Sequence, residues 1–135
     1  MITMKELMGR PMAIPAEHSS NLQKLFISVN KLRTAYGKPM KVTSGYRSLA
    51  HHLEIYKAKG ITDQSKIPMQ SNHLKGLAVD LVPVEDPIGH LHDWVNQNVS
   101  LMEDMGFYME AFEYTPTWTH FQIVAPKSGN RFFIP

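Results

Sequence analysis

The chain has 135 residues, 43% of them hydrophobic and 19% charged, which predicts one globular domain over residues 1–135 with a single core. Its net charge is only +2, without a basic cluster, which argues against a nucleic-acid partner. It contains no cysteine, so disulfides, thiolate metal ligands and a cysteine nucleophile are excluded.

Hydrophobic residues are spread along the chain and form no run of about 18, so no membrane span is predicted. Residues 1–17 are interrupted by Glu6, Arg10, Pro11 and Pro15 and lack the apolar stretch of a signal peptide. We therefore expect the protein to be made in the cytoplasm. Any action outside the cell would need another export route.

The first half of the chain predicts two helices around a short strand. Residues 1–18 read as an irregular lead-in, after which Ser20 or Asn21 can cap a helix that ends at Gly37. A strand is predicted over 40–44 and a helix over roughly 49–59, capped by Ser48, before a polar loop over 61–72. The first helix is predicted from apolar residues at helical spacing: Leu22, Leu25, Phe26, Val29, Leu32 and Tyr36.

The second half predicts three strands and two helices. A strand over 77–82 precedes a helix capped by Asp86 and a short helix with a Ser100/Glu103 capping box. Strands over 107–114 and 117–124 form a hairpin, and 125–135 is a tail whose aromatic residues cover the core. Because helices come first and the later strands pair locally, we expect an α+β domain: a small antiparallel sheet with helices packed on one side.

Two imidazoles and a carboxylate form a candidate metal site. His73 lies in a turn-rich segment, Asp80 on a strand predicted to be buried, and His120 on the hairpin. A buried carboxylate is costly unless it is paired or binds a metal. Two histidines and one aspartate can hold one zinc ion and leave its fourth position open for water, as a catalytic site needs.

The predicted hairpin register selects a second carboxylate. With a turn at 114–117, Ala111 lies opposite His120 and Glu113 opposite Trp118, so Glu113 shares the face of His120 and is within its reach. In the same register Glu110 points to the other face. A slip of one residue would reverse this assignment.

Several other polar or aromatic residues could have a structural or solvent-exposed role instead of a functional one. Ser71 is as much structural as functional, Trp118 is expected to be a pocket wall, and Arg47 could be a surface residue after a turn. Four histidines on predicted helices are interpreted as solvated. These are His51, His52, His90 and His92.

Three motifs, taken together and in order, resemble the D-alanyl-D-alanine carboxypeptidase family of zinc peptidases. They are Ser44-Gly45-Tyr46-Arg47-Ser48, Ser71-x-His73-x-x-Gly76-x-Ala78-x-Asp80 and Trp118-x-His120, which together span residues 44–120. The family includes VanX- and VanY-like enzymes, phage endolysins that cut the L-alanyl-D-glutamate bond, and the hedgehog domain. The resemblance implies the hedgehog/D-Ala-D-Ala-peptidase-like fold.

The resemblance also implies roles for the matching residues. His73, Asp80 and His120 would bind one zinc ion. Arg47 would bind the substrate's carboxylate or the developing oxyanion, and Ser71 would help to hold the site or the substrate.

The general base is less clear from the resemblance. Several members carry a glutamate three residues before the last histidine, where this chain has Thr117. Others carry it seven residues before, where this chain has Glu113, in agreement with the predicted hairpin register.

Three functions are compatible with these residues. The first is a monomeric zinc metallopeptidase that hydrolyses peptidoglycan stem peptides as a D-alanyl-D-alanine carboxypeptidase. The second is a phage endolysin that cuts the L-alanyl-D-glutamate bond, released by a holin or carried in the virion. The third is a non-catalytic, zinc-stabilised binding or phage structural module.

Overall fold

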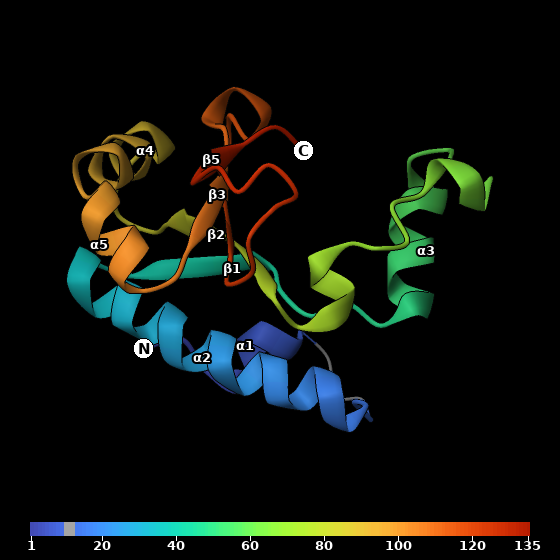
Figure 1. Ribbon diagram of the computed structural model, residues 1–135. Coiled ribbons are helices and arrows are strands. Elements are labelled where there is room, and N and C mark those ends of the chain that lie inside the picture. Colours follow the sequence, from blue (N-terminus) through green and yellow to red (C-terminus); the bar gives the residue numbers. More distant parts are fainter. Residues whose placement is uncertain (10–12) are drawn as a thin grey trace.

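The computed structural model describes residues 1–9 and 13–135, and its strands form one five-stranded sheet (Figure 1). Short 3₁₀ turns occupy Gln64–Lys66 (η1), Asn72–Lys75 (η2) and Phe112–Tyr114 (η3). None of the helices described in these ranges combines the length and hydrophobicity that a membrane crossing needs. The helices and strands are α1 (Met4–Met8), α2 (Ala16–Tyr36), β1 (Met40–Ser44), α3 (Leu49–Ala58), β2 (Ala78–Pro83), α4 (Ile88–Gln97), α5 (Val99–Asp104), β3 (Tyr108–Glu110), β4 (Thr119–Gln122) and β5 (Phe132–Phe133).

The strand order is β1-β2-β4-β3-β5, which confirms the predicted α+β class. Neighbouring strands are antiparallel except at one edge, where β5 runs parallel to β3. The segment 125–135, predicted to be a tail, thus supplies the last strand. Figure 1 shows α4 and α5 at one end of the sheet and α3 at the other.

Alternation along the strands divides the sheet into a core face and a polar face. Val79 of β2 and Met109 of β3 both pair with Phe121 of β4, and all three are fully buried in one core cluster with residues of α1, α2, α4 and α5. Each such side chain contributes roughly 1.5–3 kcal/mol by leaving water. The intervening residues Asp80 and His120 pair with each other on the opposite face.

The N-terminal boundary prediction was wrong. The expected lead-in contains α1, which begins at a capping box in which Thr3 and Glu6 bind each other's backbone N–H groups. Helix α2 begins at Ala16, before Ser20, and Pro15 is its N-cap. Pro15 can stand at the helix start because proline has no N–H that would need a partner there. Residues 16–19 therefore add about one turn to the N-terminus of the predicted helix.

Two predicted caps in the second half were also wrong. Asp86 does not cap α4; it accepts hydrogen bonds from Tyr36 Oη at 2.7 Å and Lys38 Nζ at 3.2 Å, which tie α4 to the end of α2. Helix α5 starts after Asn98 with no side-chain cap, so Ser100 lies inside the helix. In both cases a tertiary contact or chain continuity replaced the local cap.

The loops that carry the first two motifs pack on the N-terminal helices. A Cβ on Gly45 would collide with the backbone of Leu7 in α1, whose carbonyl accepts the N–H of Tyr46 at 2.7 Å. The N–H of Arg47 binds the carbonyl of His73 at 3.1 Å, and Asn21 of α2 binds the carbonyl of Lys75 at 3.0 Å. The close approach at Gly45 therefore seats the first loop on α1, and the bond from Arg47 to His73 joins it to the second loop.

Gly76 gives a stability prediction. Its φ is +75°, and a Cβ there would lie 2.8 Å from the carbonyl oxygen of His18 in α2. We expect Gly76→Ala to lower the free energy of unfolding by about 1–3 kcal/mol, measured by urea denaturation, because the backbone is strained and neither side can yield easily. Gly89→Ala is the control, since a Cβ at Gly89 meets nothing within 4 Å. An equal loss in both variants would contradict the argument.

Candidate metal centre and active site

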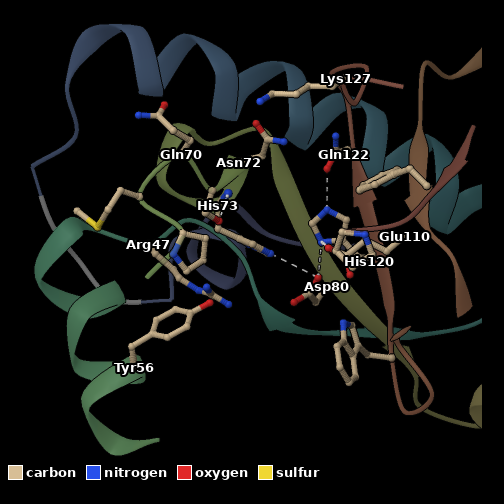
Figure 2. A pocket seen from close by; sticks show the side chains of 16 residues that line it. Arg47, Tyr56, Gln70, Asn72, His73, Asp80, Glu110, His120, Gln122 and Lys127 are labelled. Atoms are coloured by element: carbon tan, nitrogen blue, oxygen red, sulfur yellow. Dashed lines mark hydrogen bonds and ion pairs between the residues drawn. The ribbon is translucent and has the colours of Figure 1, made fainter. Parts of the chain in front are cut away.

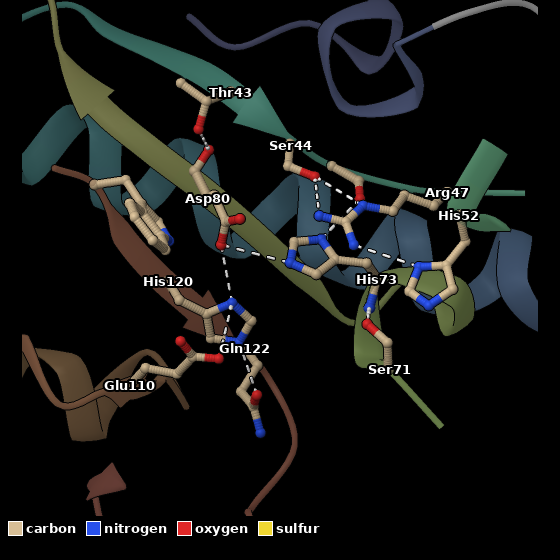
Figure 3. Close-up of polar contacts among 12 residues, drawn as sticks. Thr43, Ser44, Arg47, His52, Ser71, His73, Asp80, Glu110, His120 and Gln122 are labelled. Carbon is tan, nitrogen blue, oxygen red and sulfur yellow. Dashed lines mark hydrogen bonds and ion pairs between the residues drawn. The ribbon is translucent and has the colours of Figure 1, made fainter. Parts of the chain in front are cut away.

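The three predicted metal ligands converge on the polar face of the sheet. His73 comes from η2, Asp80 from β2 and His120 from β4. One ligand atom from each lies within 4.8 Å of the others. Asp80 Oδ1 is 2.9 Å from His120 Nδ1 and 3.5 Å from His73 Nε2 (Figure 3). Strand pairing and the η2 turn thus bring together residues that are 40 positions apart in the sequence.

Each histidine is oriented by a hydrogen bond from its other ring nitrogen. His73 Nδ1 donates to the carbonyl of Gly45 at 2.9 Å, which leaves Nε2 facing Asp80. His120 Nε2 donates to Gln122 Oε1 at 2.9 Å, which leaves Nδ1 facing Asp80. The amide of Gln122 is itself fixed, because its Nε2 donates to the carbonyl of Val124 at 2.8 Å. Such partners fix the tautomer of a metal-binding histidine.

Electrostatics keep Asp80 ionised. Burial alone would raise its pKa, but hydrogen bonds from His120 and His73 outweigh burial and hold the pKa well below its usual range. Burial likewise acts to lower the pKa of His120, and the bond to Asp80 reverses this and raises it. The carboxylate is therefore charged at neutral pH, as a metal ligand must be.

The donor set fits zinc. If zinc replaces the protons on the two ring nitrogens that face Asp80, two neutral imidazoles and one carboxylate form a known type of catalytic zinc set with a fourth position open. His73 and His120 are buried and each has its second nitrogen satisfied, so neither ring has to turn. When bound there, zinc would polarise the scissile carbonyl and make a water nucleophilic at neutral pH.

The hairpin register differs by one residue from the prediction. Tyr108 pairs with Gln122 and Met109 with Phe121, which brings Glu110, not Ala111, level with His120. The expected two-strand turn is instead a connection over residues 111–118 that contains η3. The one-residue slip exchanges the two faces, so Glu110 lies on the site face and Glu113 is exposed in η3 outside the cavity.

Glu110 is therefore the carboxylate beside the metal ligands. Its Oε1 is 3.9 Å from His120 Nδ1, and burial raises its pKa. It pairs with Phe133 of β5, whose ring meets that of His120 edge-on at 6.1 Å. The sequence analysis missed Glu110 because it placed the hairpin register one residue off; the observed register would have identified Glu110 as the residue facing His120.

Arg47 is held beside this centre. It follows β1, where a bulge between Val42 and Ser44 places Ser44, rather than Thr43, opposite Asp80. Ser44 Oγ accepts from Arg47 Nε at 3.1 Å and from Nη2 at 2.8 Å (Figure 3). The guanidinium of Arg47 is thus held by Ser44, a residue of the same sequence motif, and lines the same cavity as the candidate metal ligands.

One cavity of about 730 Å³ contains all the predicted site residues except Glu113 (Figure 2). Ser71 lines it and caps η2, where its Oγ accepts from the N–H of His73 at 3.3 Å. Trp118 lines it too, and His92 Nε2 donates to the Trp118 carbonyl at 2.8 Å. The end of β4 adds Gln122 to the cavity wall, and the chain after β4 adds Lys127, Phe133 and Pro135.

The histidine and tail interpretations need correction. His52 is fully buried and His92 stacks on Phe112 with ring centroids 4.1 Å apart, whereas His90 is exposed as expected and also contacts the Tyr36 hydroxyl at 2.9 Å. These contacts come from other elements, which a helix pattern does not show. Of the tail aromatics, Phe132 packs on the core as expected, whereas Phe133 lines the cavity.

Sequence comparison identifies the family. A sequence model of the family described as Peptidase M15 matches residues 2–120, most of the chain. The chain belongs to the Peptidase M15 family. It is therefore a zinc-dependent metallopeptidase that acts on peptidoglycan. The matched range includes His73, Asp80, His120 and Glu110, and ends before the cavity wall that follows β4.

Two solved structures are similar to this M15 peptidase. VanYB in complex with D-alanine-D-alanine shares 26% identity at a TM-score of 0.48, covering 86% of this chain and 74% of that chain. A variant of the vancomycin-resistance D,D-pentapeptidase VanY, in complex with Zn(II), shares 26% identity at a TM-score of 0.46, covering 82% and 73%. No curated protein sequence matches significantly.

Proposed function

We propose that this M15 peptidase is a D,D-carboxypeptidase that removes the terminal D-alanine from peptidoglycan stem peptides. The observation that carries the proposal is the fixed guanidinium of Arg47 in the same cavity as the His73, Asp80 and His120 site. A carboxypeptidase must recognise the free carboxylate next to the bond it cuts. A planar, permanently charged guanidinium can bind that carboxylate through two parallel hydrogen bonds.

Glu110 is the proposed general base. It lies beside His120 on the site face, and burial raises its pKa, which makes it a better proton acceptor than an exposed glutamate. In the proposed reaction Glu110 accepts a proton from the attacking water and returns it to the leaving amine of D-alanine. The peptide bond breaks, and water supplies the hydroxyl of the new carboxylate.

The remaining cavity residues are proposed to hold the substrate. Ser71 and Trp118 line the cavity on the sides of η2 and β4; the Ser71 hydroxyl accepts the N–H of His73, and the Trp118 carbonyl accepts from His92. Lys127, labelled in Figure 2 away from Arg47, lies where the acyl part of the peptide would extend. The proposal thus assigns the terminal D-alanine to the Arg47 side of the cavity.

The test is mass spectrometry of a synthetic stem pentapeptide incubated with the zinc-loaded protein. We expect loss of one D-alanine, and slow cleavage of the same peptide with a C-terminal amide. Arg47→Lys should raise KM for the free acid about 10- to 100-fold, because a hydrogen bond to a charged group is worth about 1.5–3 kcal/mol. Cleavage between L-alanine and D-glutamate would instead establish the endopeptidase alternative, and an unchanged KM would contradict the role of Arg47.

A further inference from the structure

His52 is a fully buried polar residue that the catalytic proposal does not use. It lies on α3 with 0% of its surface exposed. Its Nδ1 is 3.4 Å from Arg47 Nη1, and its Nε2 is 3.1 Å from the carbonyl of Pro68. Figure 3 shows the imidazole beside the guanidinium, on the side away from Asp80. Both ring nitrogens are therefore engaged, one by Arg47 and one by the segment that leads into η2.

The two partners determine the tautomer of His52. The carbonyl of Pro68 can only accept, so Nε2 carries the hydrogen. A guanidinium can only donate, so Nδ1 presents its lone pair to Arg47. Burial lowers the pKa of His52, and the positive charge of Arg47 acts in the same direction, so the ring is held neutral as this arrangement requires.

His52 completes the set of contacts that orients Arg47. Nε and Nη2 of Arg47 donate to Ser44, and Nη1 donates to His52. A guanidinium has five N–H groups, so these three bonds leave one N–H on each terminal nitrogen. Two N–H groups on neighbouring nitrogens can together bind both oxygens of a carboxylate.

The bond to Pro68 connects this orientation to the cavity wall. Pro68 begins the wall segment 68–73, all of which lines the cavity, including Ser71 and His73. His52 therefore fixes the guanidinium and the wall segment relative to each other from behind.

We propose that neutral His52 is a positioning residue, which holds Arg47 against the 68–73 wall segment so that its two remaining N–H groups receive the terminal carboxylate of the substrate. This inference rests on the proposed carboxypeptidase function. His52 does not touch the substrate. His52 instead raises substrate affinity, because it keeps the Arg47 side chain ordered before the substrate binds. Without His52, Arg47 would lose conformational entropy on binding.

Two substitutions test the role. His52→Gln offers an amide oxygen and an amide N–H about as far apart as the two ring nitrogens, whereas His52→Leu offers neither. For the stem pentapeptide we expect His52→Leu to raise KM about 2- to 10-fold with a much smaller change in kcat, because ordering one free side chain costs about 0.5–1.5 kcal/mol. His52→Gln should recover most of the KM. Tyr36→Phe is the control, because it removes a hydroxyl bonded to Asp86 away from the cavity and should lower Tm without changing KM.

A readout without substrate separates this inference from the proposed function. The Arg47 Nε–H resonance of the zinc-loaded protein should exchange slowly with solvent in the wild type and His52→Gln, and rapidly in His52→Leu. Failure to cleave the pentapeptide would sink the proposed function, and the resonance would still report whether His52 fixes Arg47. Slow exchange in His52→Leu would overturn the positioning role, and so would a rise in KM in Tyr36→Phe as large as the rise in His52→Leu.

Discussion

Glu110→Gln is expected to lower kcat for stem-peptide hydrolysis by about 10²–10⁴-fold, the usual contribution of a general base. Gln has nearly the same shape but cannot accept the proton from the attacking water. The zinc content, measured by elemental mass spectrometry, should be unchanged, because Glu110 is not one of the three converging ligands. A loss of zinc together with activity would place Glu110 in the metal set instead.

Glu113→Gln is the matched control, and it decides between the two hairpin registers. Glu113 is exposed in η3 and outside the cavity, so its substitution should leave kcat and KM near the wild-type values. The opposite pattern, an inactive Glu113→Gln and an active Glu110→Gln, would restore the register expected from the sequence.

The environment of Glu110 adds a pH dependence. Burial raises its pKa, and the base must be deprotonated to act. The value of kcat/KM should therefore fall as the pH drops through a pKa above that of an exposed glutamate. This acidic limb should be absent from the residual activity of Glu110→Gln.

The second large effect is expected for Asp80→Ala, which should abolish stoichiometric zinc binding and with it peptidase activity. Asp80 lies between the two imidazoles, 2.9 Å from His120 Nδ1 and 3.5 Å from His73 Nε2, and its low pKa keeps it charged. Its removal leaves two ligands, too few for a catalytic zinc site. Zinc affinity can be measured by competition with a chromophoric chelator, and activity by release of D-alanine.

Gln122→Leu should have a smaller effect on zinc binding than Asp80→Ala and serves as its comparison. Gln122 is outside the three-residue ligand set and accepts the N–H of His120 Nε2, so its loss should weaken zinc binding about 10–100-fold while excess zinc restores activity. Chelator should inactivate the wild-type enzyme, and added zinc should recover it. Full zinc binding by Asp80→Ala would contradict the assigned ligand set.

The metal ligands were predictable because their constraints are local. Alternation along a buried strand places Asp80 on one face, and the turn before it places His73 nearby, so a short window of sequence is enough. The sequence showed Gly45 and Gly76 only as motif positions, and the reason for them, the close approach of the backbones of Leu7 and His18, became visible in the fold.

The carboxylate proposed as general base was not predictable, because its position depends on the register of the hairpin. Whether Glu110 or Glu113 faces His120 depends on how residues 111–118 are folded, and the η3 turn there shifts the pairing by one residue. One residue of slip exchanges the two faces of a strand, so a small error in the turn reverses the assignment.

Burial of His52 and the role of β5 were decided by tertiary packing alone. The pattern of α3 does not show that the segment around Pro68 covers His52, and two residues are too few to predict the strand that places Phe133 against His120. The sequence by itself determined the family, the fold class and the three candidate metal ligands, since these follow from motifs and periodicity within short windows. The tertiary structure decided which groups contact Arg47 and which carboxylate lies beside His120, since both depend on contacts between segments distant in the chain.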